Sequence, residues 1–360
     1  LVFRGNWHWA AYQLNRLINC PSKSVIDVCE KTTPGLPDVT KLYWYPDATR
    51  YIPFTIHEFP IYSFVVADLH AHVINIPLVL TLLLLLISIV RSDRIRWPKV
   101  LILGLMLGIF YMTNAWDMPI YMMLSGLAIL IKTMHQDKWP KKLVVTVSMT
   151  VFFAVISLLI GLKMWRELST GSAFGIWGVM ILVVAISSLG MVGGQYISRF
   201  IEEIKSWKKY LDSGYRLALY AGLMIIGAVF TCWKFVINFE QIAQGVTFVN
   251  ANSTWWELLT LWGWDLFMGL SLLGLIGYKI LKGKVVLLVD WLMVSWWLMG
   301  VLLIILPELI YVKDIYISDY HRANTMFKLV YQSWTMFAFV GAYTVVRWWH
   351  EIREKMLPIK

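Results

Sequence analysis

The chain of 360 residues is 59% hydrophobic and only 15% charged, with a mean hydropathy of +0.64, whereas soluble domains are about 45–50% apolar and about 25% charged. This composition excludes an ordinary water-soluble domain and favours a protein surrounded by lipid. The net charge of +10 does not indicate nucleic-acid binding, because no basic patch alternates with exposed aromatic residues in a soluble segment. We expect no nucleic-acid partner.

Residues 1–56 are predicted to form an extracytoplasmic loop region, and residues 57–360 a multi-span membrane domain. Prolines interrupt the first region at Pro21, Pro34, Pro37, Pro46 and Pro53. Cys20 and Cys29 also occur there, and outside the cytoplasm they either form a disulfide or stay two free thiols. The chain begins at Leu1 with no visible signal peptide, so we expect a fragment whose N-terminal part is missing.

About nine apolar stretches follow, and most approach the roughly 20 residues that a helix needs to cross the hydrocarbon core. The expected fold class is therefore all-α, a polytopic integral membrane protein. The stretches are 77–90, 99–113, 118–131, 143–162, 174–197, 217–233, 255–279, 285–306 and 324–346.

Basic residues are concentrated in alternate gaps between these stretches. The basic gaps are 91–99, 132–142, 199–216, 279–284 and 347–360. Since Lys and Arg mark cytoplasmic loops, we expect these gaps and the C-terminus to lie in the cytoplasm. Residues 1–76 would then lie outside it. The predicted location is the cell membrane, with the lipid bilayer as the surrounding partner.

Unusual polar residues gather on the predicted outer side, first around His57-Glu58-Phe59-Pro60 and Asp68-Leu69-His70-Ala71-His72. If this segment is extended, Asp68, His70 and His72 share one face and could hold a divalent metal ion. If it is helical, Asp68, His72 and Asn75 share a face, which suits a carboxylate–imidazole pair in acid–base chemistry. The alternative is that these groups only cap and fix a helix at the membrane surface.

The second polar segment is Asn114-Ala115-Trp116-Asp117-Met118-Pro119. It fits a short outer turn between two spans. Asp117 either caps the following helix, with Pro119 in its first turn, or approaches the same outer pocket as Asp68.

The third polar segment runs from Asp319 to Lys328 and includes His321 and Asn324. Arg322 and Lys328 lie here at the outer end of the last span, against the trend that places cations inside. Two cations beside a helix N-terminus indicate a phosphate or pyrophosphate site. The alternative is that they snorkel or pair with nearby Asp314 or Asp319.

In these three segments the chain resembles the YYY family of polytopic membrane proteins, a large bacterial and archaeal group of unknown function. The resemblance rests on Ile56–Pro77, on Asn114–Tyr121 and on Asp319–Lys328, in that order, and covers nearly the whole chain. The tyrosine triplet that gives the family its name is not in this sequence. The chain therefore resembles the C-terminal portion of a member.

The resemblance implies a distant relationship to GT-C glycosyltransferases, which are multi-span enzymes that use polyprenyl-phosphate sugars and have an acidic site on an outer loop. It implies a GT-C-like fold and a membrane glycosyltransferase. Asp68, or less favourably Glu58 or Asp117, would be the catalytic carboxylate. A divalent metal would bind Asp68, His70 and His72. The substrate-binding residues would be His70, His72, Asn114, His321, Arg322, Asn324 and Lys328.

Two other functions remain open from the sequence. A transporter or flippase would be indicated by interrupted helices in paired repeats, and the sequence has no internal repeat. A non-catalytic membrane scaffold would use the outer polar residues only as structural anchors.

Overall fold

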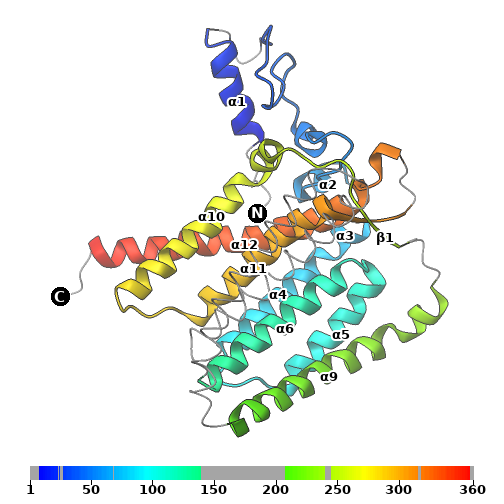
Figure 1. The fold of residues 1–360 in the computed structure, drawn as a ribbon, viewed down its shortest axis with the longest axis vertical. Helices are drawn as coiled ribbons and strands as arrows, with labels where there is room; N and C mark the ends of the chain where they lie inside the picture. Colours follow the sequence, from blue (N-terminus) through cyan, green and yellow to red (C-terminus); the bar gives the residue numbers. More distant parts are fainter. Residues whose placement is uncertain are drawn as a thin grey trace, which may run out of the picture.

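The computed structural model describes residues 8–22, 24, 27–67, 69–138, 207–239, 245–314 and 318–356. Within these ranges the fold is all-α apart from one small sheet (Figure 1). The helices are α1 (His8–Asn19), α2 (Pro60–Val65), α3 (Ala71–Ile74), α4 (Ile76–Arg91), α5 (Trp97–Thr113), α6 (Asp117–Gln136), α9 (Trp207–Asn238), α10 (Trp255–Leu281), α11 (Leu288–Leu309) and α12 (Ala323–Met356), with 3₁₀ turns η1 (Tyr45–Arg50) and η2 (Ser318–Tyr320).

The small sheet consists of β1 (Val246–Phe248) and β2 (Ile310–Val312), which pair antiparallel with Val246 opposite Val312. β1 lies in the segment before α10, and β2 directly follows α11. The sheet therefore ties together the two connections that lead into α10 and α12.

Six helical stretches in the described part of the chain are long and apolar enough to cross a membrane. They are Ala71–Arg91, Asp117–Gln136, Asp212–Asn238, Trp255–Leu281, Leu288–Leu309 and Ala323–Glu354. Each coincides with a predicted span, and the predicted span 99–113 is the shorter apolar helix α5. The predicted spans 143–162 and 174–197 lie outside the described residues. The chain is thus a polytopic membrane protein, and the full number of nine spans stays a prediction.

The core is formed where α11 packs against both α6 and α12, with α4 against α6 and α10 against α12 (Figure 1). Trp296 of α11 and Phe337 of α12 are fully buried there. The leucine run of α4 contributes Leu82, Leu83 and Leu86, each with no exposed surface. Because lipid tails are as apolar as leucine, close packing between these side chains, rather than escape from water, holds such helices together.

Helix α9 packs closely along α5, and glycines lie at the contact between the two helices. A methyl group on Gly108 would come 2.5 Å from the carbonyl oxygen of Ala228, and one on Gly227 would come 2.9 Å from the backbone nitrogen of Leu105. These positions allow the two backbones to touch, as small residues do between membrane helices. Substitution by any larger residue would force α9 away from α5.

The bundle has two chemically different ends. Helices α4, α6, α10 and α12 begin at one end, where α5, α9 and α11 finish; we call it the site end. The other end carries the Lys- and Arg-rich segments 91–99, 132–138 and 279–284, and we call it the basic end.

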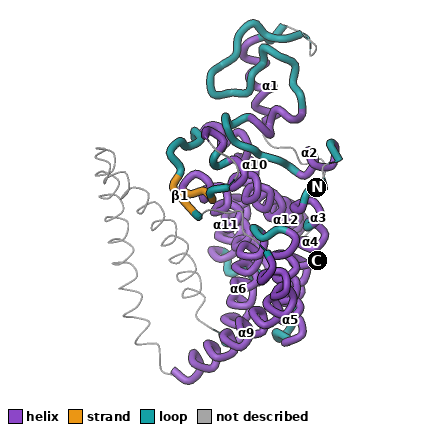
Figure 2. Tube along the Cα trace, turned by 90° about the vertical axis from the view of Figure 1, so that its right-hand side faces the viewer, coloured by secondary structure: helices purple, strands orange, loops and turns teal. Residues whose placement is uncertain are grey.

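The N-terminal segment packs around its own small cluster, formed by Tyr12, Cys20, Cys29 and Val39. Cys20 and Cys29 are joined in a disulfide that spans nine positions, so the paired alternative holds rather than two free thiols. Asn15 donates hydrogen bonds to the Thr32 hydroxyl at 2.7 Å and to the Pro37 carbonyl at 2.8 Å. Figures 1 and 2 show α1 and its loops standing beyond the site end of the bundle.

Candidate functional site

The first polar segment folds into two short helices before α4 begins. Pro60 begins α2, and Ala67 has a positive φ of 52° in the turn after it. α3 follows His70, and Pro77 lies in the first turn of α4, a position that tolerates its missing N–H. The chain is thereby folded back onto the site end of the bundle.

The two predicted histidine ligands lie next to each other but differ in exposure. His72 and Asn75 are three residues apart in helical backbone, and their exposed fractions are only 1% and 0%, whereas His70 is exposed. The arrangement of these three follows the helical alternative, in which His72 and Asn75 share a face. Asp68, the first candidate for the catalytic carboxylate, lies outside the described residues.

Asp117 is the centre of a buried hydrogen-bond network. The Asn75 side-chain nitrogen donates to one carboxylate oxygen at 2.5 Å, and the Asn114 side-chain nitrogen donates to the other at 2.9 Å. The Thr113 hydroxyl donates to the Asn75 side-chain oxygen at 3.1 Å. Buried carboxylates require such donors. The network joins the beginning of α4, the end of α5 and the beginning of α6, and Trp116 rather than Asp117 occupies the N-cap position.

Helix α12 completes this network from far along the sequence. The Gln332 side chain and the charge of Lys328, both on α12, act on the Asp117 carboxylate. Gln332 also accepts a hydrogen bond from the Tyr121 hydroxyl at 2.5 Å. Neither Tyr121 nor Gln332 was among the predicted site residues. Their signal in the sequence is a polar side chain one to two turns inside an otherwise apolar span.

A carboxylate–imidazole pair lies beside the Asp117 network. The Nε2 atom of His72 is 3.8 Å from a carboxylate oxygen of Glu58, whose side chain is 12% exposed against 1% for His72. The Ser63 hydroxyl donates to the same Glu58 oxygen at 3.5 Å. Glu58 is therefore paired with a group that can exchange a proton, and its carboxylate is also partly accessible from outside the protein.

Aromatic rings enclose His72. The Phe327 and Tyr331 rings of α12 meet its ring edge-on, each with a centroid distance of 4.6 Å, and the His70 ring stacks on it at 5.7 Å. The Lys328 ammonium group lies 4.8 Å from the Phe327 ring centroid, a distance suited to a cation–π contact. Lys328 thus reaches the surroundings of both His72 and Asp117.

Arg322, predicted to bind phosphate, is paired within the protein. Its guanidinium donates to the Glu308 carboxylate at 2.7 Å and to the Ser253 hydroxyl at 3.2 Å, and Arg322 is 5% exposed. Its partner is neither Asp314 nor Asp319 but Glu308, which was not among the predicted partners. The signal for Glu308 is a single acidic residue, after Pro307, at the end of an apolar stretch.

Two other predicted substrate ligands lie where the chain that follows β2 enters α12, with His321 just before the helix and Asn324 as its second residue. The Asn324 side-chain nitrogen donates to the Asp314 carboxylate at 2.5 Å. The His321 ring packs against that of Tyr311, with 4.5 Å between centroids. Together with the Arg322–Glu308 pair, these contacts fix the start of α12, the helix that carries Lys328.

The predicted metal site depends on a residue that is not described. Among the described residues, no three His, Cys, Asp or Glu side chains come together closely enough to hold a metal ion. Of the proposed ligands, His72 is buried against Glu58 while His70 is exposed. The third ligand would be Asp68, so the metal stays a prediction.

Comparison with known proteins identifies the chain at the level of a family. The family described as uncharacterized membrane protein (DUF2298) matches residues 1–175, 170–297 and 288–337. No curated protein matches the chain, and no solved structure does. The family match covers all three polar segments and agrees with the spans described above. The chain therefore belongs to this family of uncharacterized membrane proteins.

Proposed function

We propose that the protein is a membrane glycosyltransferase that uses a polyprenyl-phosphate-linked sugar donor, with its active site on the extracytoplasmic face. The observation that carries the proposal is the Glu58–His72 pair, 3.8 Å apart, beside Lys328 at the site end. A carboxylate, an imidazole and a cation at the end of membrane spans suit transfer from a lipid phosphate. The implied relationship to GT-C enzymes supports the same chemistry.

The transfer needs a base for the acceptor hydroxyl. The carboxylate takes the hydroxyl proton, the hydroxyl oxygen bonds to the sugar C1, and the bond from C1 to the phosphate oxygen breaks. Glu58 suits this role better than Asp117, because Asp117 has no exposed surface and both its oxygens accept amide hydrogen bonds. Asp68 remains the other candidate, since it precedes His70 by two residues.

Asp117 is better suited to positioning. Its bond to Asn75 holds the segment that carries His72, and its bond to Asn114 holds the turn between α5 and α6. A fixed second layer of this kind keeps the reacting groups within the narrow tolerance that catalysis requires.

The leaving group is a polyprenyl phosphate, whose charge grows as the C1–oxygen bond breaks. Lys328 is the cation that would stabilise this charge, because Arg322 is already ion-paired with Glu308. No step of the proposed mechanism runs through a metal. A divalent ion held with His70 and His72 would add Lewis acidity toward the phosphate.

The decisive experiment uses the intact protein in proteoliposomes with a panel of labelled polyprenyl-phosphate sugars, and measures release of polyprenyl phosphate. Glu58→Gln should lower release about 10²- to 10⁴-fold if Glu58 is the base. Lys328→Gln should lower it roughly tenfold or more through lost charge stabilisation. Matched controls at exposed positions near the start of α12, Asp319→Asn and Lys313→Gln, should keep wild-type release.

The other outcomes are equally informative. Loss in Asp68→Asn with normal release in Glu58→Gln would assign the base to Asp68. No turnover with any donor, from protein that remains folded, would argue against the glycosyltransferase and for transport or scaffolding.

A further inference from the structure

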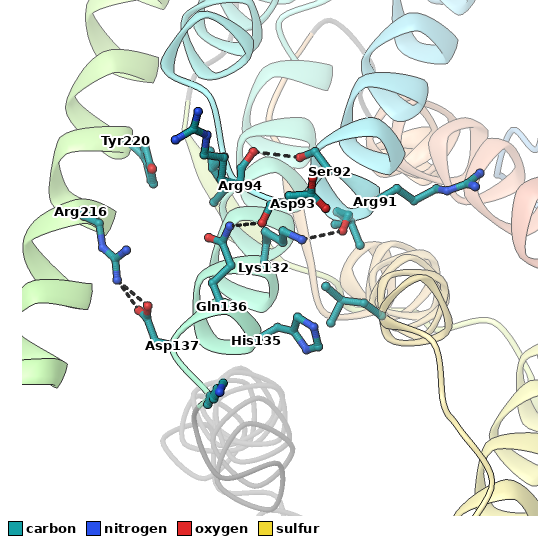
Figure 3. A pocket seen from close by; sticks show the side chains of 14 residues that line it. Arg91, Ser92, Asp93, Arg94, Lys132, His135, Gln136, Asp137, Arg216 and Tyr220 are labelled. Carbon is teal, nitrogen blue, oxygen red and sulfur yellow. Dashed lines mark hydrogen bonds and ion pairs between the residues drawn. The ribbon is translucent and has the colours of Figure 1, made fainter.

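The basic end of the bundle contains a cavity of about 820 Å³, far from the proposed catalytic groups. Figure 3 shows that its walls come from the turn after α4, the end of α6 and the beginning of α9. The volume lies within the range of about 300–1,000 Å³ typical of ligand pockets. The proposed glycosyl transfer makes no use of this cavity.

Cations dominate the described lining. They are Arg91, Arg94, Lys132, Lys138 and Arg216, against the two carboxylates of Asp93 and Asp137. Asp137 is already engaged, because it accepts two hydrogen bonds from Arg216 at 2.6 Å. The charge of Asp93 acts on Lys132. The described lining therefore has five cations against two carboxylates, one of which is already paired.

Two of these cations are not engaged by a carboxylate in the part of the chain that the structure describes. Arg94 and Lys138 are exposed and line the cavity, and neither forms an ion pair with another residue in the described ranges. Lys132 is 5% exposed and donates to the Val90 carbonyl at 3.2 Å, so a buried ammonium group contributes to the same wall. The cavity thus has an excess of positive charge.

The position of the cavity indicates where its ligand comes from. It lies at the ends of the spans, and its lining includes the apolar side chains of Val90, Ile95 and Leu288. Trp97 begins α5 next to this region and is 62% exposed, as expected of a tryptophan at the membrane–water interface. An adjoining cavity of about 560 Å³ is lined by the same turn and extends the cations to Arg96 and Lys99.

We propose that this cavity binds the phosphate of an anionic phospholipid headgroup. Basic pockets between membrane helices on the positively charged side recognise such headgroups. The apolar part of the wall would contact the glycerol and the upper acyl chains, while Arg94 and Lys138 contact the phosphate. The bound lipid would join α4, α6 and α9, of which the protein itself links α6 and α9 there through the Arg216–Asp137 pair.

The test follows thermal unfolding of the intact protein in neutral detergent while phosphatidylglycerol is added in mixed micelles. Phosphatidylcholine with the same acyl chains and inorganic phosphate are the two comparison ligands. Wild type should be stabilised by phosphatidylglycerol and not by phosphatidylcholine. Arg94→Gln/Lys138→Gln should require roughly tenfold more phosphatidylglycerol for the same stabilisation.

A matched control removes one arginine and one lysine from the same end but outside the cavity, in Lys282→Gln/Arg353→Gln, both exposed. The control variant should need the same phosphatidylglycerol concentration as wild type, within about twofold, for the same thermal stabilisation, because these charges face open solvent. A single Arg94→Glu variant provides a second measure if the double variant is poorly folded, and it should weaken the lipid effect at least as strongly.

Three results would overturn the proposal. One is a cavity variant with the wild-type dependence on phosphatidylglycerol, and another is an equal weakening in the control variant, which would mean a diffuse attraction of charges. The third is equal stabilisation by inorganic phosphate that the cavity variant abolishes. That result would assign the cavity to a soluble phosphate instead of a lipid.

Discussion

The hydroxyl of Tyr121 donates a hydrogen bond to the Gln332 side-chain oxygen, 2.5 Å away and 211 positions further along the chain. Both residues are buried, at 0% and 2% exposure. This bond connects α6 with α12 one turn below Asp117. It therefore couples the network around Asp117 to the helix that carries Lys328.

Tyr121→Phe should lower the free energy of unfolding by about 1–3 kcal/mol, because it leaves the buried Gln332 oxygen without this donor. Thermal or denaturant unfolding in detergent, followed by tryptophan fluorescence, measures the change. Tyr215→Phe is the control, since Tyr215 is 67% exposed and should change stability by less than about 0.5 kcal/mol. A double-mutant cycle with Gln332→Ala that returned no interaction energy would contradict the coupling.

Arg322→Ala should destabilise the protein by about 3–5 kcal/mol, because it leaves the charge of the buried Glu308 carboxylate without the cation that balances it. Lys41→Ala is the comparison, as Lys41 is 61% exposed and lies 3.9 Å from Asp47. An exposed pair of that kind contributes roughly 0–1 kcal/mol. Similar unfolding curves for both variants would show that Arg322 is not a structural anchor and would return it to the candidates for phosphate binding.

Removal of the Cys20–Cys29 disulfide should loosen the N-terminal cluster without unfolding the bundle. In the chain-entropy description, a disulfide that closes a loop of about ten residues raises the free energy of unfolding by roughly 2–3 kcal/mol. The N-terminal cluster is separate from the main core, so the effect should stay within it. Cys20→Ser/Cys29→Ser should therefore be cleaved faster by trypsin near the exposed Lys41. Cys232→Ala, which changes the buried free cysteine of α9, should leave this cleavage rate unchanged.

Acid should destabilise the protein through His57. Burial, with smaller effects from Arg322 and Arg50, lowers the pKa of this fully enclosed imidazole to about 3 from the ordinary 6.5. Between those two values the unfolded chain binds a proton that the folded chain does not, so stability is full above about pH 6.5 and falls as the pH decreases toward 3. The loss should approach about 1.4 kcal/mol per pH unit.

His57→Asn should flatten this dependence, while His350→Asn, at an exposed position, should not. Unfolding midpoints measured between pH 7 and pH 4.5 test the difference. His8 contributes in the same direction, since burial lowers its pKa to about 4, so some slope should persist in the His57 variant. Equal slopes in wild type and His57→Asn would contradict the prediction.

The spans were predictable because an apolar run is a local property of the sequence. The predicted span boundaries differ from the helix ends in the structure where polar residues continue a helix. The last span was predicted over 324–346, but α12 continues to Met356. Arg347 explains part of the extension, since it donates to Asp290 of α11 at 2.8 Å and so pairs a charge beyond the apolar run. Hydropathy cannot register a helix turn that is stabilised by an ion pair with another helix.

The gathering of the three polar segments was also predictable, because all of them lie at span ends on one side of the bundle. The pairings within it were not. Whether Arg322 meets Asp314, Asp319 or Glu308 depends on how α11 and α12 are rotated against each other, and no local pattern encodes that rotation. The same holds for Tyr121 and Gln332, whose contact requires the packing of α6 near α12.

The short helix α5 has a consequence for the depth of the site. Its 17 residues extend about 26 Å at 1.5 Å per residue, whereas the hydrocarbon layer is about 30 Å thick. Membranes accommodate such a hydrophobic mismatch by thinning locally. Since α5 ends at Thr113, directly before the Asn114 that donates to Asp117, the thinned patch would draw lipid headgroups and water down to the level of the buried carboxylate. The polyprenyl-phosphate donor that we propose would then meet the reacting groups below the average plane of the membrane surface.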